Sequence, residues 1–191
     1  MSIEFPFPVV SVSGDRVEAE LIRLRQNCEE TGVVPVIVGD RESAARLVEL
    51  FDEPFDYDAE LLAAANFSPE AWFSERREKE EGCILAQSDI PPDGTAPMTQ
   101  LTVGYNYFSG PRSEVFIATL PTDDTTAIPV LLRFGDWNAC PASHVHMALA
   151  RYWGERFGAR IATITSDIVE FTVERPPTDD AQALDAIPKR V

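Results

Sequence analysis

Cys140 is the residue of this sequence best suited to covalent chemistry. Pro141 follows it and favours the first position of a helix, which places Cys140 at the helix N-cap. There the helix dipole and the free backbone N–H groups lower the pKa of a thiol and favour the nucleophilic thiolate. His144 lies one helical turn further on and is the expected general base. The alternative is a small buried cysteine that closes a tight turn.

A metal site at the same helix is not indicated. His144 and His146 are two positions apart, so in a regular helix they differ by about 200° around the axis and point to opposite sides. Cys140 and His144 can share a face, but Cys83 or Asp167 would have to complete the ligand set. Two ordinary helix histidines, one solvated and one packed, are the simpler interpretation. We expect no metal ion and no cofactor.

Four polar or aromatic residues are candidates for binding. Trp137 and Asn138 can form an aromatic wall and an orienting amide, or else a core anchor and a turn residue. Asp167 and Glu170 are a carboxylate pair beside an expected hairpin, and Glu170 lies on the strand face opposite its neighbours. The alternative places Asp167 in the turn and Glu170 in solvent. If the protein is an enzyme, we expect Trp137, Asn138 and Glu170 to line one pocket with Cys140.

The elements that would position these residues predict an α/β fold. In the N-terminal part, residues 9–12 and 33–38 read as strands on either side of a helix, which predicts a β-α-β unit over residues 8–38. The second strand is continuously apolar, as in a strand covered on both faces. Pro35 lacks a ladder donor and moves that strand towards a sheet edge or a bulge. Asp40 opens a second helix, and Ser68 with Pro69 opens a later one.

The C-terminal half gives the fold α+β character. Residues 101–107 and 115–120 read as strands, a short helix spans 129–135, and a longer helix runs from Pro141 to Gly158. Residues 161–165 and 168–173 form a C-terminal β-hairpin, so the sheet is mixed and flanked by helices. We expect a single domain over residues 1–191, with a weak internal boundary at 88–100.

Composition narrows the classes of partner. The 191 residues are 45% hydrophobic, and 16 Lys and Arg against 32 Asp and Glu give a net charge of −16. Such a charge repels nucleic-acid phosphates and anionic membranes and favours a basic protein partner. Three cysteines without a paired motif fit free thiols in a reducing cytoplasm. We expect no secretion signal, because the N-terminal residues lack a basic start and a continuous apolar stretch, and no apolar run reaches about 20 residues.

The second half of the chain resembles a known family. Residues 131–141 read Leu-Leu-Arg-Phe-Gly-Asp-Trp-Asn-Ala-Cys-Pro, followed by Ala-Arg-Tyr-Trp, Phe-Gly-Ala and Asp-Ile-Val-Glu-Phe at 150–153, 157–159 and 167–171. Together these segments resemble the bacterial family called domain of unknown function 4253, over residues 115–177. Phe157 stands where the family usually has tyrosine, and we expect the family's tryptophan-rich C-terminal extension to be absent. The resemblance implies a fold and a bacterial cytosolic origin, and it carries no established activity.

Two functional hypotheses follow. The first is a non-catalytic, acidic protein-binding module, immunity-like, adaptor or regulatory, that engages a basic partner. The second is a small-molecule enzyme, a hydrolase or transferase, with Cys140 as nucleophile and His144 as base. A structural subunit of a larger assembly is a third interpretation. The sequence leaves the oligomeric state open.

Overall fold

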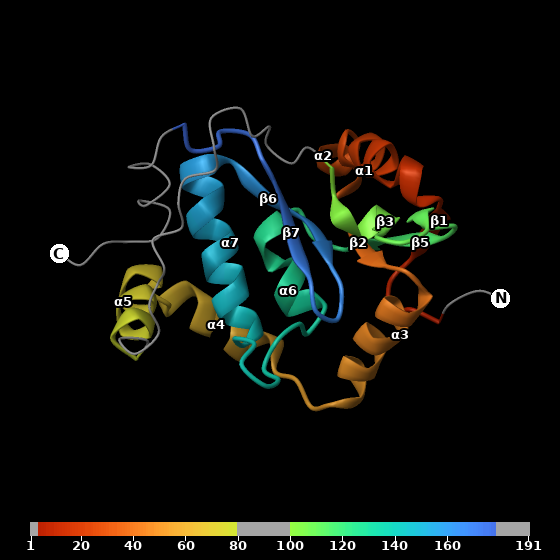
Figure 1. The fold of residues 1–191 in the computed structure, drawn as a ribbon. Helices are drawn as coiled ribbons and strands as arrows, with labels where there is room; N and C mark the ends of the chain where they lie inside the picture. Colours follow the sequence, from red (N-terminus) through yellow and green to blue (C-terminus); the bar gives the residue numbers. More distant parts are fainter. Residues whose placement is uncertain (1–3, 80–99, 179–191) are drawn as a thin grey trace.

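The computed structural model describes residues 4–79 and 100–178, in which five strands form a mixed sheet of order β1-β5-β2-β6-β7 (Figure 1). The strands are β1 (Val9–Val12), β2 (Val34–Gly39), β5 (Val115–Leu120), β6 (Ala159–Ile164) and β7 (Val169–Val173). Strand β5 runs antiparallel to β1 and β2, whereas β2 and β6 are parallel and β6 and β7 form an antiparallel hairpin. The predicted α/β class and mixed sheet are confirmed.

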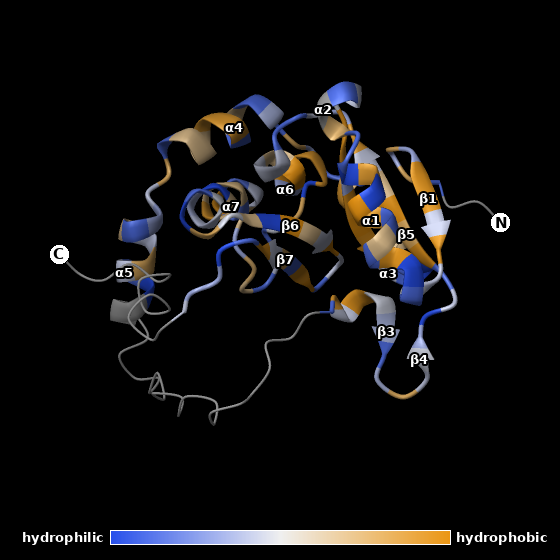
Figure 2. Ribbon diagram, turned by 90° about the horizontal axis from the view of Figure 1, so that it is seen from above, coloured by the Kyte–Doolittle hydropathy of each residue, from blue (hydrophilic) through white to orange (hydrophobic). Residues whose placement is uncertain are grey.

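Helices cover both faces of this sheet. In the described ranges they are α1 (Val17–Arg25), α2 (Cys28–Thr31), α3 (Arg41–Glu49), α4 (Tyr57–Asn66), α5 (Pro69–Lys79), α6 (Ile128–Leu131) and α7 (Ser143–Phe157). Helices α3, α6 and α7 share one core cluster with Val36 and Val38 of β2, and α1 packs on Ile37 in a second cluster. Because neighbouring residues of a strand point to opposite faces, β2 joins the two clusters. In Figure 2 strand β5 is mostly hydrophobic, whereas β3 and β4 of the small sheet are mostly hydrophilic.

The position of β2 corrects one prediction and supports another. All six of its residues are buried, as its continuous hydrophobicity indicates. The strand is nevertheless the central one of five, so the expectation of an edge strand at Pro35 is wrong. Pro35 lies opposite Thr119 of β5, and the register shift of this pair occurs later, between Ile37 and Gly39. The predicted β-α-β unit is present, but β5 lies between its two strands.

The stretch 101–107 is not the strand that its apolar residues predict. It forms a short 3-10 helix, Thr102–Gly104, and the two-residue strand β3 (Tyr105–Asn106), which pairs with β4 (Gly110–Pro111) in a separate small sheet. The backbone N–H of Leu101 donates to Glu18, and that of Thr102 donates to Glu170. Side-chain carboxylates thus take donors that a longer strand would pair with a neighbour.

The structure confirms two of the predicted helix starts and corrects a third. Asp40 caps α3 by accepting from the backbone N–H of Ser43, and Ser68 accepts from that of Ala71 at the start of α5, as expected. Helix α7 begins at Ser143 instead of Pro141. The predicted boundary at 88–100 lies almost entirely outside the described residues. None of the helices in the described ranges has the length and apolarity needed to cross a bilayer.

Candidate functional site

The two predicted carboxylates and Cys140 lie on different sides of β7, since Cys140 contacts His146 at the apolar pocket beside α7. Val169 and Phe171 line an apolar pocket with α7. Asp167 lines a separate polar cleft, and Glu170 binds Thr102, which lines the same cleft. Side chains alternate along β7, so Glu170 faces away from Val169 and Phe171, whereas Asp167 lies in the turn before the strand. A single pocket that joins these carboxylates to Cys140 is therefore not what the chain builds.

The polar cleft, of about 440 Å³, opens at the carboxyl ends of the parallel strands β2 and β6. This edge of a parallel strand pair is where α/β folds commonly bind ligands. Its charged and polar lining includes Asp40, Glu42, Arg46, Thr102, Arg112 and Asp167. These residues come from the first turns of α3, the 3-10 turn before β3, the segment after β4 and the β6–β7 turn.

Two glycines hold Arg112 at the cleft. The backbone N–H of Gly14 donates to the Arg112 carbonyl at 2.8 Å, and the N–H of Arg112 donates to the Gly104 carbonyl at 2.9 Å. A Cβ on Gly14 would lie 1.8 Å from the Gly104 oxygen. Only glycine permits this approach of three backbone segments, and the resulting contact directs the Arg112 guanidinium towards α3.

Arg112 and Asp40 form an ion pair at the base of α3. Arg112 Nη1 lies 2.6 Å from Asp40 Oδ2, and both side chains are about one-third exposed. Burial alone would raise the pKa of Asp40, but hydrogen bonds from Ser43 and the charge of Arg112 outweigh it and lower the pKa. Arg46 is paired in the same way with Glu42 at 2.6 Å. Both cationic groups of the cleft thus have carboxylate partners.

Asp167 has a different environment. Its carboxylate accepts a hydrogen bond from Thr165 Oγ1 at 3.0 Å and one from Ser166 Oγ at 3.4 Å. In the described part of the chain no ion pair involves Asp167. Glu170 accepts two hydrogen bonds of 2.6 Å from the N–H and hydroxyl of Thr102, and its Oε2 is buried without a hydrogen-bond partner among the described residues. Glu170 is half-buried and holds Thr102 at the edge of the cleft.

Cys140 contacts His146, so the prediction that His144 is its partner is wrong. The Cys140 Sγ lies 3.4 Å from His146 Nε2. Because α7 begins at Ser143, Cys140 precedes the helix and is not its N-cap, so the four-residue spacing to His144 does not place the two side chains together. The N–H of Cys140 donates to the carbonyl of Trp137 at 2.8 Å, which closes a tight turn.

Burial keeps this pair uncharged at neutral pH. Burial raises the pKa of the Cys140 thiol, which contradicts the expected thiolate. Burial also lowers the pKa of His146, although a hydrogen bond to the backbone of Pro141 acts in the opposite direction. Since proline has no N–H, this bond runs from an imidazole N–H to the Pro141 carbonyl. A neutral imidazole can accept a proton, but the raised pKa of the thiol keeps the proton on sulfur. The contact therefore resembles a nucleophile and its base in geometry only.

His144 instead binds the carboxylate of Glu60 on α4. Glu60 Oε2 lies 3.0 Å from His144 Nδ1 and accepts the backbone N–H of His144 at 2.9 Å. A carboxylate at this position satisfies a free N–H and complements the positive end of the α7 dipole. The pair joins α4 to α7 and leaves His144 no contact with Cys140.

Trp137 and Asn138 fit the structural alternative. The Trp137 ring packs edge-on against Phe134, with ring centroids 5.0 Å apart, at the margin of the core. Asn138 is exposed and has a φ of 49°, one of three positive values at non-glycine residues, with Arg133 and Asp136, in the described chain. Asparagine tolerates this left-handed conformation better than most residues. The Trp-Asn-Ala-Cys-Pro block thus builds a compact loop that presents Cys140 to His146.

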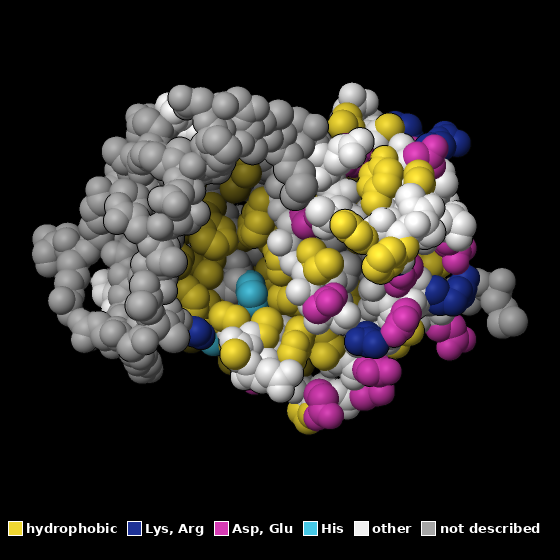
Figure 3. Space-filling model, viewed as in Figure 1, with side chains coloured by type: hydrophobic (Ala, Val, Ile, Leu, Met, Phe, Trp, Pro, Cys, Tyr) yellow, Lys and Arg dark blue, Asp and Glu magenta, His cyan; other side chains and the backbone are white. Residues whose placement is uncertain are grey.

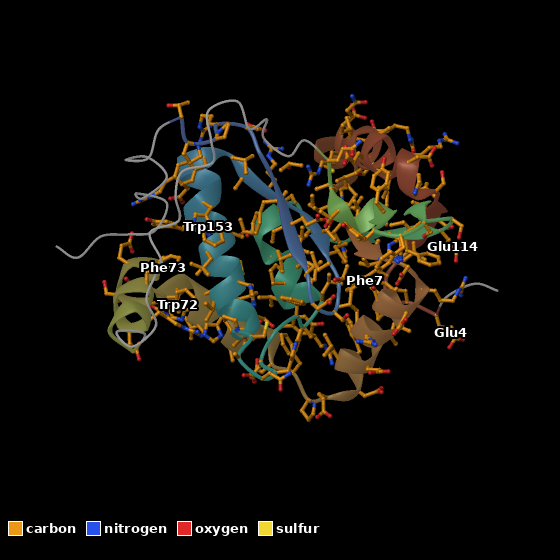
Figure 4. The ribbon with its side chains drawn as sticks, in the orientation of Figure 1. Glu4, Phe7, Trp72, Phe73, Glu114 and Trp153 are labelled. Carbon is orange, nitrogen blue, oxygen red and sulfur yellow. The ribbon has the colours of Figure 1, made fainter. Side chains whose placement is uncertain are left out.

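An apolar pocket of about 220 Å³ lies beside α7. Its lining consists of Pro129, His146, Leu149, Trp153, Ile161, Val169 and Phe171. Figure 3 shows a hollow of hydrophobic side chains with a histidine at its base. On its outer side Trp153 lies near Phe73 and Trp72 of α5 (Figure 4), with 6.4 Å between the Trp153 and Phe73 ring centroids.

Residues 51–58, which we call the acidic loop, end in the first turn of α4. The guanidinium of Arg133 donates to the carbonyls of Phe51 and Glu53 in this loop at 3.0 Å. The same guanidinium lies over the rings of Phe51, Phe55 and Tyr57. The exposed carboxylates here are Asp52, Glu53, Asp56 and Asp58. None of the four forms an ion pair within the described ranges.

Sequence reasoning missed His146 and Arg112. The helical spacing argument set His146 apart from Cys140, but that argument fails because Cys140 lies before the helix. Arg112 lies in a segment without a motif, and only its backbone contacts bring it to Asp40. Across residues 4–79 and 100–178, no group of three or more His, Cys, Asp or Glu side chains could hold a metal ion.

Comparison with known families supports the resemblance seen in the sequence. Residues 116–187 match the family described as Domain of unknown function (DUF4253). We call residues 116–187 the DUF4253 segment. No curated protein and no solved structure matches the chain significantly. The DUF4253 segment contains Cys140, His146 and Asp167, whereas Asp40 and Arg112 of the polar cleft lie before it.

Proposed function

We propose that this protein is a non-catalytic binding module that engages a basic partner through the polar cleft. It works in the bacterial cytoplasm in an immunity-like, adaptor or regulatory role. The cleft receives an arginine or lysine side chain of the partner, and Asp167 is the carboxylate that meets it.

The observation that carries this proposal is the charge balance of the cleft. Arg46 and Arg112 each have a carboxylate partner, whereas Asp167 has only neutral hydroxyl partners among the described residues. A bound cation would complete the set, and a guanidinium can bind a carboxylate through two parallel hydrogen bonds. The positive end of the α3 dipole does not prevent a cation from binding here, because the Asp40 carboxylate already caps that helix end.

The net charge of the whole chain also favours a basic partner. With a net charge of −16, the protein attracts a basic partner over a distance, and this attraction is screened by salt. Association is then fast at low ionic strength and slows as salt is added. The four carboxylates of the acidic loop contribute to this field but line no described pocket.

Titration with arginine amide tests the proposal directly. We expect Asp167→Asn to weaken binding about fivefold, the equivalent of roughly 1 kcal/mol for an exposed ion pair. The control is Asp123→Asn, which removes the same charge from an exposed residue outside the cleft. Equal affinities of both variants would show that only net charge matters, and would refute the cleft as the binding centre.

A second candidate function rests on the contact of 3.4 Å between Cys140 and His146. In a thiol-dependent hydrolase or transferase, Sγ would bond to a substrate carbonyl carbon while its proton passes to Nε2. The imidazolium would return that proton to the departing alcohol or amine, and water or an acceptor would release the acyl group. His146 replaces the predicted His144 as the base in this scheme.

Thiol alkylation distinguishes the two functions. In a chain that also carries Cys28→Ser and Cys83→Ser, only Cys140 can react with iodoacetamide. Because burial raises the pKa of Cys140, we expect slow alkylation at neutral pH that His146→Gln leaves unchanged. An enzyme with His146 as its base would instead react rapidly and lose about tenfold or more in the variant.

A further inference from the structure

The apolar pocket beside α7 has the dimensions of a small-ligand site. Its volume of about 220 Å³ exceeds the roughly 150 Å³ of an apolar protein cavity known to hold benzene. His146, Leu149 and Trp153 are spaced by three and four residues, so one face of α7 forms a wall. Strands β6 and β7 provide the opposite wall through Ile161 and Phe171.

The pocket offers a ligand little hydrogen bonding. The polar atoms of its lining side chains are the two imidazole nitrogens of His146 and the indole nitrogen of Trp153, and both imidazole nitrogens have partners. One faces the Cys140 sulfur at 3.4 Å, and the other donates to the Pro141 carbonyl. A ligand hydroxyl buried beside the imidazole would lose its bonds to water without gaining a new one there, which lowers affinity.

The walls are fixed before any ligand arrives. Phe134 packs edge-on against the His146 imidazole at 4.9 Å between ring centroids, which adds to its two polar contacts. Trp153 packs edge-on against Phe171 at 5.6 Å, so the two large rings support each other. A pocket with preorganised walls binds without the cost of ordering them.

We infer that this pocket binds a compact apolar group the size of one substituted aromatic ring. The buried part of the ligand carries no hydrogen-bonding group. This site is independent of the polar cleft, because Val169 and Phe171 point to the α7 side of the sheet whereas Asp167 lines the cleft.

Titration of the full chain with toluene and phenol tests this inference. The two probes have nearly the same shape and differ in a methyl and a hydroxyl group. We expect toluene to shift the methyl NMR signals of Leu149, Ile161 and Val169, and phenol to bind at least tenfold more weakly. Equal affinity for both probes, or no shift of these signals with toluene, overturns the inference.

A pair of variants on one strand locates the site. Val169→Phe places a ring inside the pocket and should reduce toluene binding at least tenfold. The control Val173→Phe makes the same change on the same strand face at a position that is 43% exposed and outside the pocket. Unchanged toluene binding by folded Val169→Phe places the ligand elsewhere and contradicts the inference. The toluene and phenol comparison in the unmodified chain decides the matter if Val169→Phe does not fold.

Discussion

Cys140 and His146 show how burial governs two neighbouring titratable groups. It raises the pKa of the thiol and lowers the pKa of the imidazole, so both favour their neutral forms. A neutral thiol–imidazole hydrogen bond is suited to holding the loop before α7 on the helix. The same two residue types at a helix N-terminus would favour a thiolate, so the position of the helix start decides the chemistry.

The stability of the folded protein should therefore depend on His146 in acid. Because the pKa of His146 is lower in the folded protein, the unfolded chain binds more protons as the pH falls below about 6.5. Protonation thus favours the unfolded state. We expect the stability advantage of the unmodified chain over His146→Gln to narrow between pH 7 and pH 5, as measured by urea denaturation.

The free energies of unfolding of the unmodified chain and of His146→Gln should differ least at the acidic end of that pH range. A stability difference that widens as the pH falls would mean that the folded protein holds the imidazolium better than water does. Such a result would contradict the buried, neutral state of His146.

At the scale of elements, Arg133 holds the acidic loop against α6. Its Nη1 bonds two loop carbonyls, Nε contacts the Tyr57 hydroxyl at 3.3 Å, and the guanidinium lies 4.7 Å from the Phe51 ring centroid. A lysine side chain carries the same charge but has no planar fork. Arg133→Lys should therefore lose about 1–2 kcal/mol of stability.

Urea denaturation of matched variants measures this loss. Arg23→Lys is the control, because Arg23 is exposed and pairs only with its helix neighbour Glu20 in the described contacts. We expect the control to change stability by less than about 0.5 kcal/mol. Similar losses in both variants would show that the loop does not depend on the planar guanidinium.

The elements divide into those that local sequence determines and those that distant contacts determine. Strand β2 and the β6–β7 hairpin follow from their apolar runs, and α3 follows from its cap at Asp40. The strand predicted at 101–107 fails because Glu18 and Glu170, from distant parts of the chain, bind its backbone donors. Likewise, β5 separates β1 from β2, which no local pattern indicates.

The candidate site was less predictable than the fold. Asp167 could be chosen from its type and its place beside a hairpin, but its cleft depends on Asp40 and Arg112, which are far away in the sequence. The Cys140 contact required the true start of α7, and Pro141 suggested one two residues too early. An error of this size at a helix end exchanges one histidine partner for another.

At the scale of the whole molecule, the polar cleft gathers residues from both halves of the chain. Asp40 follows the central strand β2, Asp167 follows its parallel neighbour β6, and Arg112 arrives from the segment between β4 and β5. Of these three residues, only Asp167 lies in the DUF4253 segment. The net charge of −16 surrounds this cleft with a field that favours cations. Function at the cleft therefore requires the N-terminal half to be folded onto the DUF4253 segment.

The most direct measurement maps backbone amide NMR shifts during titration with arginine amide. We expect the largest shifts to fall on cleft residues, with Ser43, Thr165 and Asp167 among them. Asp167→Asn should need about fivefold more arginine amide to produce these shifts, whereas Asp123→Asn should need no more than the unmodified chain. Shifts centred on Asp52, Glu53 and Asp58 of the acidic loop, with the cleft unchanged, would contradict it.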